Sequence, residues 1–445
     1  MSPTTIPPDA RTPLDDSPYQ GYLYSYPHKT SYRPLDPPVA LGPLWEAERR
    51  DALFLYVHIP FCGMRCGFCN LFTRAGASED AVARYLAALT RQARRVREAL
   101  GDARFARFAL GGGTPTYLDA RSLDTVLDLA ERVMGADLRA VPASVEVSPE
   151  TVDAEKLNSL VTRGVDRISI GVETFDDAEA SAVFRPQSVA TVEKALDLIR
   201  EAGPSILNVD LIYGLPGQSV ASWVRSVDRA LRRRPEELYL YPLYVRPLTG
   251  LERSGKSWDD LRLACHREGR DLLISEGYEQ VSMRMFRRID AVEEAGPTYS
   301  CQDDGMVGLG CGARSYTQDL HYATEYAVAA KGVRAILDDY ASRPDVRFDF
   351  ADYGRRLGPE DQRRRFVLQG LLTCEGLNLA SYEARFGASA LDDLPELTTL
   401  VHLGLADLTA GVLRLSERGL ERSDAVGPWL ISEAVRQASE DYSWR

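Results

Sequence analysis

Short apolar runs alternate with amphipathic stretches from about residue 53 onward. The runs typical of strands cover 53–59, 107–110, 144–147, 167–171, 207–212 and 238–244. Stretches with helical periodicity lie between them, at 80–100, 123–134, 154–163 and 190–202. Such alternation predicts parallel βα units with right-handed crossovers. Six units are fewer than the eight of a closed barrel, so we expect an α/β fold built on a partial, TIM-like (β/α)6 barrel with an open side.

The rest of the chain divides into three further regions. Residues 1–50 are rich in Pro and Tyr and lack periodicity, which favours an extended arm, or a partly disordered leader for the first fifteen residues. The barrel itself is expected over 51–250. Residues 251–358, with helical patterns at 258–276 and 326–340, are interpreted as a barrel extension carrying substrate-side elements. Short helices and an apolar run at 411–416 predict a small helical and β-ribbon C-terminal domain over 359–445.

Composition narrows the class of protein. The chain has 445 residues, of which 44% are hydrophobic and 27% charged, a balance typical of a globular protein with a sizeable core. A net charge of −12 argues against nucleic-acid and anionic-membrane partners. No apolar run approaches the roughly 18 residues of a transmembrane helix, and no signal-peptide pattern is visible. We therefore expect a cytoplasmic protein without a membrane or nucleic-acid partner.

Cysteine usage points to metal chemistry. The chain has seven cysteines, an odd number, and Cys62, Cys66 and Cys69 lie close together. In a reducing compartment, clustered cysteines indicate metal ligands or redox catalysts rather than disulfides. The three thiols have C-x3-C-x2-C spacing and directly follow the first predicted strand, at the end of the barrel where active sites are assembled.

This spacing favours an iron–sulfur cluster. Thiolates are soft ligands suited to such clusters. Three local ligands leave one iron of a [4Fe–4S] cube open, and that iron can accept the amino and carboxylate groups of S-adenosylmethionine (SAM). Zinc usually takes four ligands, supplied by one C-x2-C pair and a second pair distant in the sequence. This chain has no second pair, and His58 is the one further candidate ligand near the three cysteines. A thioredoxin-like C-x2-C pair would leave Cys62 unexplained. We therefore interpret Cys62, Cys66 and Cys69 as cluster ligands and as catalytic residues.

Further motifs resemble those of a known family. They read Tyr-Val-His-Ile-Pro-Phe-Cys at 56–62, Gly-Gly-Gly-Thr-Pro-Thr at 111–116 and Asn-Val-Asp-Leu-Ile-Tyr-Gly-Leu-Pro-Gly-Gln at 208–218. With these, the chain from about 53 to about 427 resembles the HemN/HemW-like branch of the radical SAM superfamily, the oxygen-independent coproporphyrinogen III oxidase-like family. The resemblance implies a [4Fe–4S] cluster and SAM, in one or two copies, as cofactors.

The resemblance also implies which residues contact SAM. They are Tyr56, Phe68, Gly112, Gly113, Thr114, Glu146, Glu173, Arg185, Asp210 and Ile212. Glycines that follow a strand let the backbone approach a ligand closely. Asp210 interrupts a strongly apolar strand, and burying an unpaired carboxylate is costly, which by itself favours a function for it. Glu173 stands where the family usually has Gln.

Two departures affect the expected reaction. The family's oxidases carry a cysteine two residues after the third ligand, where this chain has Leu71, and the heme-chaperone segment His-Asn-x-x-Tyr-Trp is absent, with Tyr-Ser-Cys-Gln-Asp-Asp at 299–304. We expect an oxidoreductase that cleaves SAM to a 5′-deoxyadenosyl radical and abstracts hydrogen from a small-molecule or tetrapyrrole-like substrate other than coproporphyrinogen III. The resemblance also implies a reductant such as flavodoxin or ferredoxin. A C-methyltransferase using a second SAM and a non-catalytic heme or cluster carrier remain alternatives.

Overall fold

The structure, a computed structural model, describes residues 14, 16–23, 25–185, 187–292 and 305–444. The chain forms two compact units. The larger unit comprises 32–269, 290–356 and 443–445, and the smaller comprises 1–31, 270–289 and 357–442. These units divide the chain at other places than the four ranges expected from the sequence, because segments distant in the chain pack together within the smaller unit. The four ranges stay a prediction about domain organisation.

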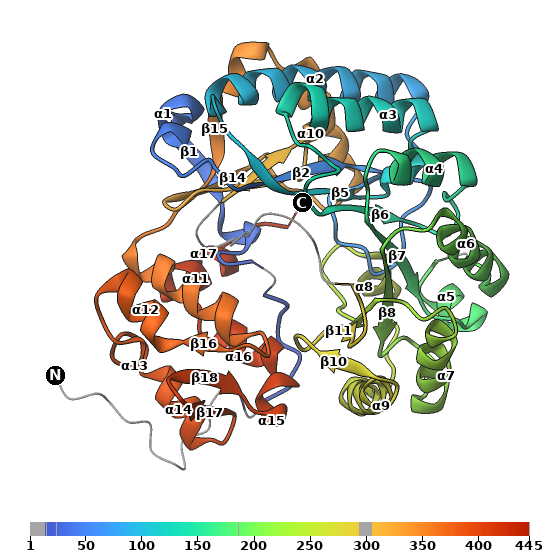
Figure 1. Cartoon of the computed structure of the whole chain (residues 1–445), viewed down its shortest axis with the longest axis vertical. Coiled ribbons are helices and arrows are strands. Elements are labelled where there is room, and N and C mark those ends of the chain that lie inside the picture. The colour runs from blue at the N-terminus through green and yellow to red at the C-terminus, as the bar shows by residue number, and fades with distance from the viewer. Residues whose placement is uncertain (1–13, 15, 24, 186, 293–304, 445) are drawn as a thin grey trace. The chain divides into compact units, whose positions relative to one another are not determined.

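Six neighbouring parallel strands form the centre of the larger unit (Figure 1). In sheet order they are β2 (Leu53–Ile59), β5 (Phe105–Gly112), β6 (Ala143–Val147), β7 (Arg167–Glu173), β8 (Ile206–Tyr213) and β9 (Glu237–Pro242). The helices between them line the outer side of the sheet (Figure 1): α2 (Glu79–Leu100), α3 (Ala120–Asp128), α4 (Ala154–Thr162), α5 (Asp177–Ala182), α6 (Val189–Ala202) and α7 (Val220–Leu231). The predicted α/β partial barrel is confirmed.

Local sequence sets where these helices begin. Ser78, Asp119 and Asp153 lie at the N-caps of α2, α3 and α4, and each side chain accepts a hydrogen bond from a backbone N–H of the first turn. The helix predicted over 123–134 divides into α3 and a π-helical turn, Leu129–Met134. That turn ends at Gly135, whose φ of 80° suits a residue without Cβ.

Side chains alternate between two environments along the barrel strands. On β6, Ala143, Val145 and Val147 are buried, whereas Ser144 and Glu146 are accessible. Successive side chains of a strand point to opposite faces, so the buried set packs under the helices and the accessible set faces the barrel interior. At β6 the interior of this partial barrel is therefore polar and accessible.

The sheet continues beyond β2 with strands that the sequence did not predict individually. β12 (Met306–Leu309) pairs in parallel with β2 on the side opposite β5. β13 (Arg314–Tyr316), β14 (Leu320–Ala323), β15 (Phe350–Arg356) and β1 (Arg33–Ala40) follow as antiparallel neighbours. The larger unit also contains α1 (Leu41–Glu46), α8 (Gly250–Ser254), α9 (Arg262–Ser275, which extends into the smaller unit) and α10 (Ala330–Ser342).

The smaller unit is helical with a three-stranded ribbon, as predicted. Its helices are α11 (Pro359–Leu371), α12 (Leu379–Phe386), α13 (Ala390–Asp393), α14 (Glu396–His402), α15 (Glu417–Leu420), α16 (Ser423–Trp429) and α17 (Glu433–Glu440). The ribbon has the order β16 (Leu377–Asn378), β18 (Val412–Leu415) and β17 (Ala406–Thr409), and a separate hairpin joins β10 (Tyr278–Gln280) to β11 (Met285–Arg288).

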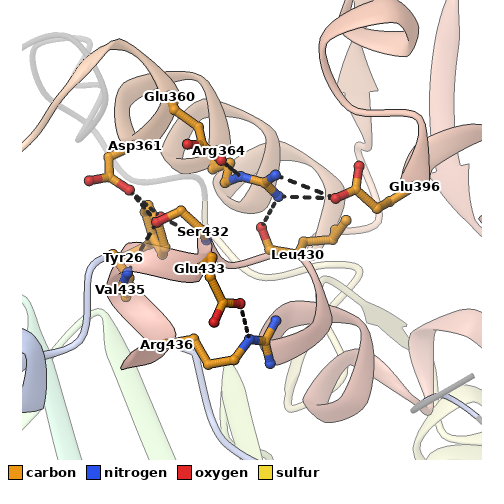
Figure 2. A network of polar contacts seen from close by, with 10 residues as sticks. All are labelled: Tyr26, Glu360, Asp361, Arg364, Glu396, Leu430, Ser432, Glu433, Val435 and Arg436. Carbon is orange, nitrogen blue, oxygen red and sulfur yellow. Dashed lines mark hydrogen bonds and ion pairs between the residues drawn. The ribbon is translucent and has the colours of Figure 1, made fainter. Parts of the chain in front are cut away.

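N-terminal residues form part of the core of this smaller unit. Leu14 and Tyr26 are buried in the same apolar cluster as Val367 and Leu397. The Tyr26 hydroxyl donates to Asp361 at 2.6 Å, and Ser432 shares the same carboxylate oxygen at 2.7 Å (Figure 2). No helix among the described residues has the length and apolar character needed to cross a membrane.

Candidate functional site

The three cysteines lie in one loop at the carboxyl end of β2. The short strand β3 (Phe61–Cys62) pairs with β4 (Arg74–Ala75) and closes the loop at its base. The Cys69 backbone N–H donates to the Cys66 carbonyl at 3.1 Å, which tightens the segment between the second and third thiols. All three cysteines are free and half-buried. Residues 62–74 are called the cluster loop below.

The glycine-rich turn after β5 packs closely against this loop. The Gly113 and Thr114 backbone N–H groups donate to the carbonyls of Ile59 and Phe61, each at 2.8 Å. A Cβ at Gly113 would lie 2.9 Å from the Cys62 sulfur and 2.7 Å from the Phe61 carbonyl oxygen. The Thr114 hydroxyl lies 3.6 Å from the Cys62 sulfur and donates to it. The glycine is therefore what allows the two loops to approach.

The buried Arg185 donates a hydrogen bond to the second thiol, Cys66. The Arg185 guanidinium donates to the Cys66 sulfur at 3.1 Å and lies 3.4 Å from the Glu173 carboxylate. It also donates to the Gly171 carbonyl at 2.6 Å and to the Gln187 side chain at 2.7 Å, which fix its orientation. A cationic donor of this kind stabilises a thiolate.

The donor set fits an iron–sulfur cluster. Burial raises the pKa of Cys62 to about 12 and that of Cys66 to about 11, so the free thiols stay protonated at neutral pH. Binding to a metal deprotonates such thiols. Among the described residues, no three His, Cys, Asp or Glu side chains converge to hold a single metal ion. A cubane cluster takes each thiolate on a different iron, so its ligands do not need to converge on one ion.

Three carboxylates come from the ends of neighbouring strands. Glu146 on β6 accepts the Gly112 backbone N–H at 2.9 Å, and a Cβ at Gly111 would lie 2.8 Å from its carboxyl group. Burial raises the pKa of Glu146, and it raises the pKa of Glu173 against the lowering effect of Arg185. Glu173 ends β7 with a φ of 65°, which is unusual for a residue with a side chain.

Asp210 on β8 is the third carboxylate. The Asn208 side-chain amide donates to it at 2.8 Å. Burial raises the pKa of Asp210 to about 7, and repulsion from Glu173 adds to the shift. The side-chain oxygen of Asn208 is buried and has no hydrogen-bond partner in the described part of the chain. A buried orphan acceptor beside a destabilised carboxylate fits a site that a hydrogen-bond donor completes.

Other predicted SAM contacts fall into two places. Phe68 and Ile212 pack in one apolar cluster, together with Leu215 and Leu243. The Tyr56 hydroxyl lies instead on the His58 ring, 3.1 Å from Nδ1. The roles of all these residues toward SAM stay predictions. Cys301 and the segment 299–304, which mark a departure from the family, lie outside the described residues.

His58 was not among the predicted contacts. Its Nε2 lies 3.1 Å from the Phe72 carbonyl, which can only accept, so Nε2 carries the proton and Nδ1 accepts from Tyr56. Cβ atoms at Gly112 and Gly312 would lie 2.7 Å and 2.8 Å from this ring. His58 thus fills a space that two glycines leave open beneath the cluster loop. Its place in the motif at 56–62 was the available signal.

Gln218, the last residue of the motif at 208–218, has a structural role. Its side-chain oxygen accepts the Gly214 backbone N–H at 2.6 Å, and its amide donates to the buried Glu179 carboxylate at 3.0 Å. Glu179 also accepts from the hydroxyls of Thr174 and Ser222. This network holds the turn after β8, and with it the position of Ile212.

Two family models match this chain. The radical SAM superfamily matches residues 56–230, and the HemN C-terminal domain matches 357–421. The oxygen-independent coproporphyrinogen III oxidase of Paracoccus denitrificans is 29% identical over 391 residues, covering 83% of this chain and 84% of the relative. The heme chaperone HemW of Bacillus subtilis is 26% identical over 375 residues, covering 82% of this chain and 95% of HemW.

A solved structure supports the fold. The coproporphyrinogen III oxidase HemN from Escherichia coli, described as a radical SAM enzyme, superposes with a TM-score of 0.79 at 24% identity, covering 92% of this chain and 96% of that one. The barrel with its three-cysteine loop, the C-terminal domain and the relatives agree. The chain therefore carries a radical SAM domain and a HemN C-terminal domain, and it is similar over most of its length to HemN/HemW-like, coproporphyrinogen III oxidase-like proteins; the cofactors of the radical SAM superfamily are a [4Fe–4S] cluster and SAM.

Proposed function

We propose that the protein is a radical SAM oxidoreductase that abstracts hydrogen from an organic substrate. The observation that carries this proposal is the cluster loop itself. Its three thiols share one loop at the barrel mouth. Thr114, just after β5, and Arg185, between α5 and α6, donate hydrogen bonds to the sulfurs of Cys62 and Cys66. A site built only to hold a zinc ion would not need this arrangement.

Each residue has a role in this proposal. Cys62, Cys66 and Cys69 would hold the cluster, and with three protein ligands one iron would stay open to SAM. When bound there, the cluster would supply the one-electron reduction that cleaves SAM to methionine and a 5′-deoxyadenosyl radical. Thr114 and Arg185 offset the negative charge on sulfur through their hydrogen bonds.

The remaining predicted contacts orient SAM and exclude water. Glu146 and Asp210 accept from the cationic and hydroxyl groups of SAM, which relieves the desolvation of these carboxylates. Phe68 and Ile212 form an apolar wall for the adenine. This arrangement holds the sulfonium in one orientation and keeps water from the radical.

The substrate differs from coproporphyrinogen III in this proposal. Leu71 replaces the thiol that the family's oxidases carry at this position, and an exposed leucine cannot replace a thiol in proton or hydrogen transfer. A tetrapyrrole-like or other small organic molecule remains the substrate class. Methyl transfer from a second SAM is the alternative outcome, and methyl-labelled SAM separates the two, because only methylation moves label into the product.

The decisive experiment is anaerobic cluster reconstitution followed by SAM cleavage with dithionite. Wild-type protein should bind four irons per chain and release 5′-deoxyadenosine, as expected for one [4Fe–4S] cluster per chain. Cys62→Ala, Cys66→Ala and Cys69→Ala should each lose the cluster signal and the cleavage. Cys374→Ala, a half-buried thiol of the smaller unit, is the matched control and should behave as wild type. Full cleavage by any of the three ligand variants would refute the ligand assignment.

Heme carriage is the second candidate, because the match to HemW covers 95% of that relative. A carrier would bind hemin stoichiometrically and release no 5′-deoxyadenosine above background. Titration with hemin, beside the cleavage assay on the same preparation, separates the two functions. Hemin binding with no cleavage by a fully loaded cluster would favour the carrier.

A further inference from the structure

We propose that the exposed surface beside the cluster loop docks a small acidic electron-transfer protein that reduces the cluster. The surface, called here the cluster-loop face, consists of Met64, Arg65, Leu71, Phe184 and Lys256. This inference rests on the proposed function, because only a redox site needs a reductant. It adds to that function the place where the electron enters and the charge of the protein that delivers it.

Large apolar side chains are exposed on this face. Met64 is 40% exposed, and Leu71 and Phe184 are each 45% exposed. Met64 and Leu71 belong to the cluster loop, on either side of Cys66 and Cys69. Water-exposed apolar groups that gather in one place, with charged residues around them, mark interaction sites. The metal ligands thus sit in the same loop as two of these side chains.

Phe184 is in direct contact with the cluster loop. A Cβ at Gly67, the residue after Cys66, would clash with the Phe184 ring, so the ring packs closely against this backbone. The Gly67 N–H donates to the Val183 carbonyl at 2.8 Å, and its carbonyl accepts from the Leu251 N–H at 2.8 Å. Two outside segments therefore fix Gly67, and the exposed ring is separated from the second cluster ligand by a single residue.

Two cationic side chains lie beside the cluster loop. The Lys256 ammonium lies 5.5 Å from the centre of the Phe184 ring, and the Arg65 guanidinium donates to the Cys69 carbonyl at 3.2 Å. Neither makes an ion pair with an acidic residue in the described ranges. Residues 61–75 contain two arginines and no Asp or Glu, and Glu252 is the one acid between Leu251 and Lys256, beside Arg253.

Several other surface arginines of the larger unit have acidic partners. Arg232 pairs with Asp228 at 3.2 Å and Arg233 with Asp197 at 2.8 Å. In a chain of net charge −12, Arg65 and Lys256 make the surface beside the cluster loop locally basic. Such a face attracts a protein of opposite charge and raises its association rate. An anionic partner is therefore favoured over a neutral or basic one.

The expected encounter is brief and salt-sensitive. Electron-transfer complexes use small interfaces, below about 1,200 Å² in total, with a few apolar contacts inside a charged rim. One electron leaves the reduced carrier and enters the cluster site, and the carrier departs oxidised by one electron. No bond forms between the two proteins, so the complex needs to persist only for that transfer.

The test compares two reductants acting on the same cluster-loaded protein. Lys256→Glu and the double variant Phe184→Ser/Lys256→Glu are assayed for 5′-deoxyadenosine with dithionite and with a reduced flavodoxin or ferredoxin. The carrier-driven rate should fall by about tenfold or more at low salt, because the charge complementarity is reversed. Iron content and the dithionite-driven rate should stay at the wild-type value. Lys194→Glu, the same charge change at an exposed site on α6, should change neither rate.

Three results would overturn the docking surface. One is an unchanged carrier-driven rate in both variants. Another is an equal fall with dithionite, which would assign the face to SAM or the substrate. The third is wild-type protein that cleaves SAM with dithionite but accepts electrons from neither carrier. Wild-type protein that cleaves no SAM even with dithionite refutes the proposed function itself, and the docking surface with it, so the two failures are distinguishable.

Discussion

Both units bury charged groups, but they stabilise them in different ways. In the smaller unit, the Arg284 guanidinium forms an ion pair with Asp424, and both residues are buried. The same guanidinium stacks 3.7 Å from the centre of the Tyr22 ring. The ion pair and the ring contact are both made by residues of the same unit.

At the barrel mouth, Glu173 lies 3.4 Å from Arg185, but Glu146 and Asp210 make no such ion pair within the described part of the chain. Glu146 accepts one backbone N–H, and Asp210 has Asn208 as a neutral donor while Glu173 repels it. Burial raises the pKa of all three groups. Buried groups that keep a raised carboxyl pKa are common at functional sites, because the missing partner is the ligand. The comparison teaches that internal pairing marks a structural charge, and incomplete pairing marks a binding one.

The largest effect on stability is expected at the buried ion pair of Arg284 and Asp424. Arg284→Met should lower the unfolding free energy of the smaller unit by about 3–5 kcal/mol, because it leaves the Asp424 charge buried and alone. Arg284→Met with Asp424→Leu should recover much of that loss, since no unpaired charge remains. Chemical denaturation measures both. Arg232→Met, which removes an exposed pair, should shift stability by less than about 1 kcal/mol. An Arg284→Met variant as stable as wild type would refute the distinction.

The next effect concerns the contact between two loops at the mouth. Gly113→Ala should cost about 1–3 kcal/mol, because the new methyl group meets the Phe61 carbonyl and the Cys62 sulfur. Displacing Cys62 should also lower the iron bound after reconstitution, which an iron assay measures. Gly63→Ala is the control within the same loop, where an added Cβ meets nothing within 4 Å. Equal iron content in both variants would show that Gly113 serves only as a turn.

A smaller effect is expected from the network in Figure 2. Tyr26→Phe removes one of two hydroxyl donors to Asp361, and Ser432 remains as the other. The loss should be about 1–2 kcal/mol, since a charged acceptor keeps a partner. A double-mutant cycle with Ser432→Ala measures the coupling between the two donors by denaturation. Strictly additive losses would mean that the shared carboxylate does not couple them.

Sequence patterns predicted the barrel well because its strands are long and regular. The apolar run at 53–59 coincides with β2. β1 was missed because it contains Pro34, Pro37 and Pro38, and proline lacks the N–H that a central strand needs. The prolines are tolerated because β1 lies at the edge of the sheet, paired only with β15. β12, with four residues, is too short for periodicity to identify.

Sequence patterns likewise predicted some features of the site and missed others. Cys62, Cys66 and Cys69 are neighbours in sequence, so their spacing alone suggested a shared metal. The contact of Arg185 with Cys66 joins residues 119 positions apart, and no local pattern contains it. The family resemblance predicted that Arg185 contacts SAM. In the structure its guanidinium also donates to the sulfur of Cys66, a predicted cluster ligand. Contacts of this kind depend on which strand ends the fold brings together.

The most specific expected effect lies in the pH dependence at Asp210. Its pKa is raised from 3.8 to about 7 by burial and by Glu173, with Asn208 and Arg167 acting in the opposite direction and Glu146 adding repulsion. Between those two values the native state holds a proton that the unfolded state has released. Linkage then requires that the stability from this group is full below about pH 4 and is lost as the pH rises through 7.

Asp210→Asn cannot ionise, yet its amide oxygen can still accept from Asn208. The unfolding free energy of the variant minus that of the wild type should therefore rise between pH 5 and pH 8.5 in cluster-free protein. Denaturation at matched pH values measures this difference without any ligand. Glu201→Gln, an exposed carboxylate on α6, should give a difference that stays flat. A flat difference for Asp210→Asn as well would mean that the mouth already satisfies this carboxylate, which would remove the contrast with Asp424.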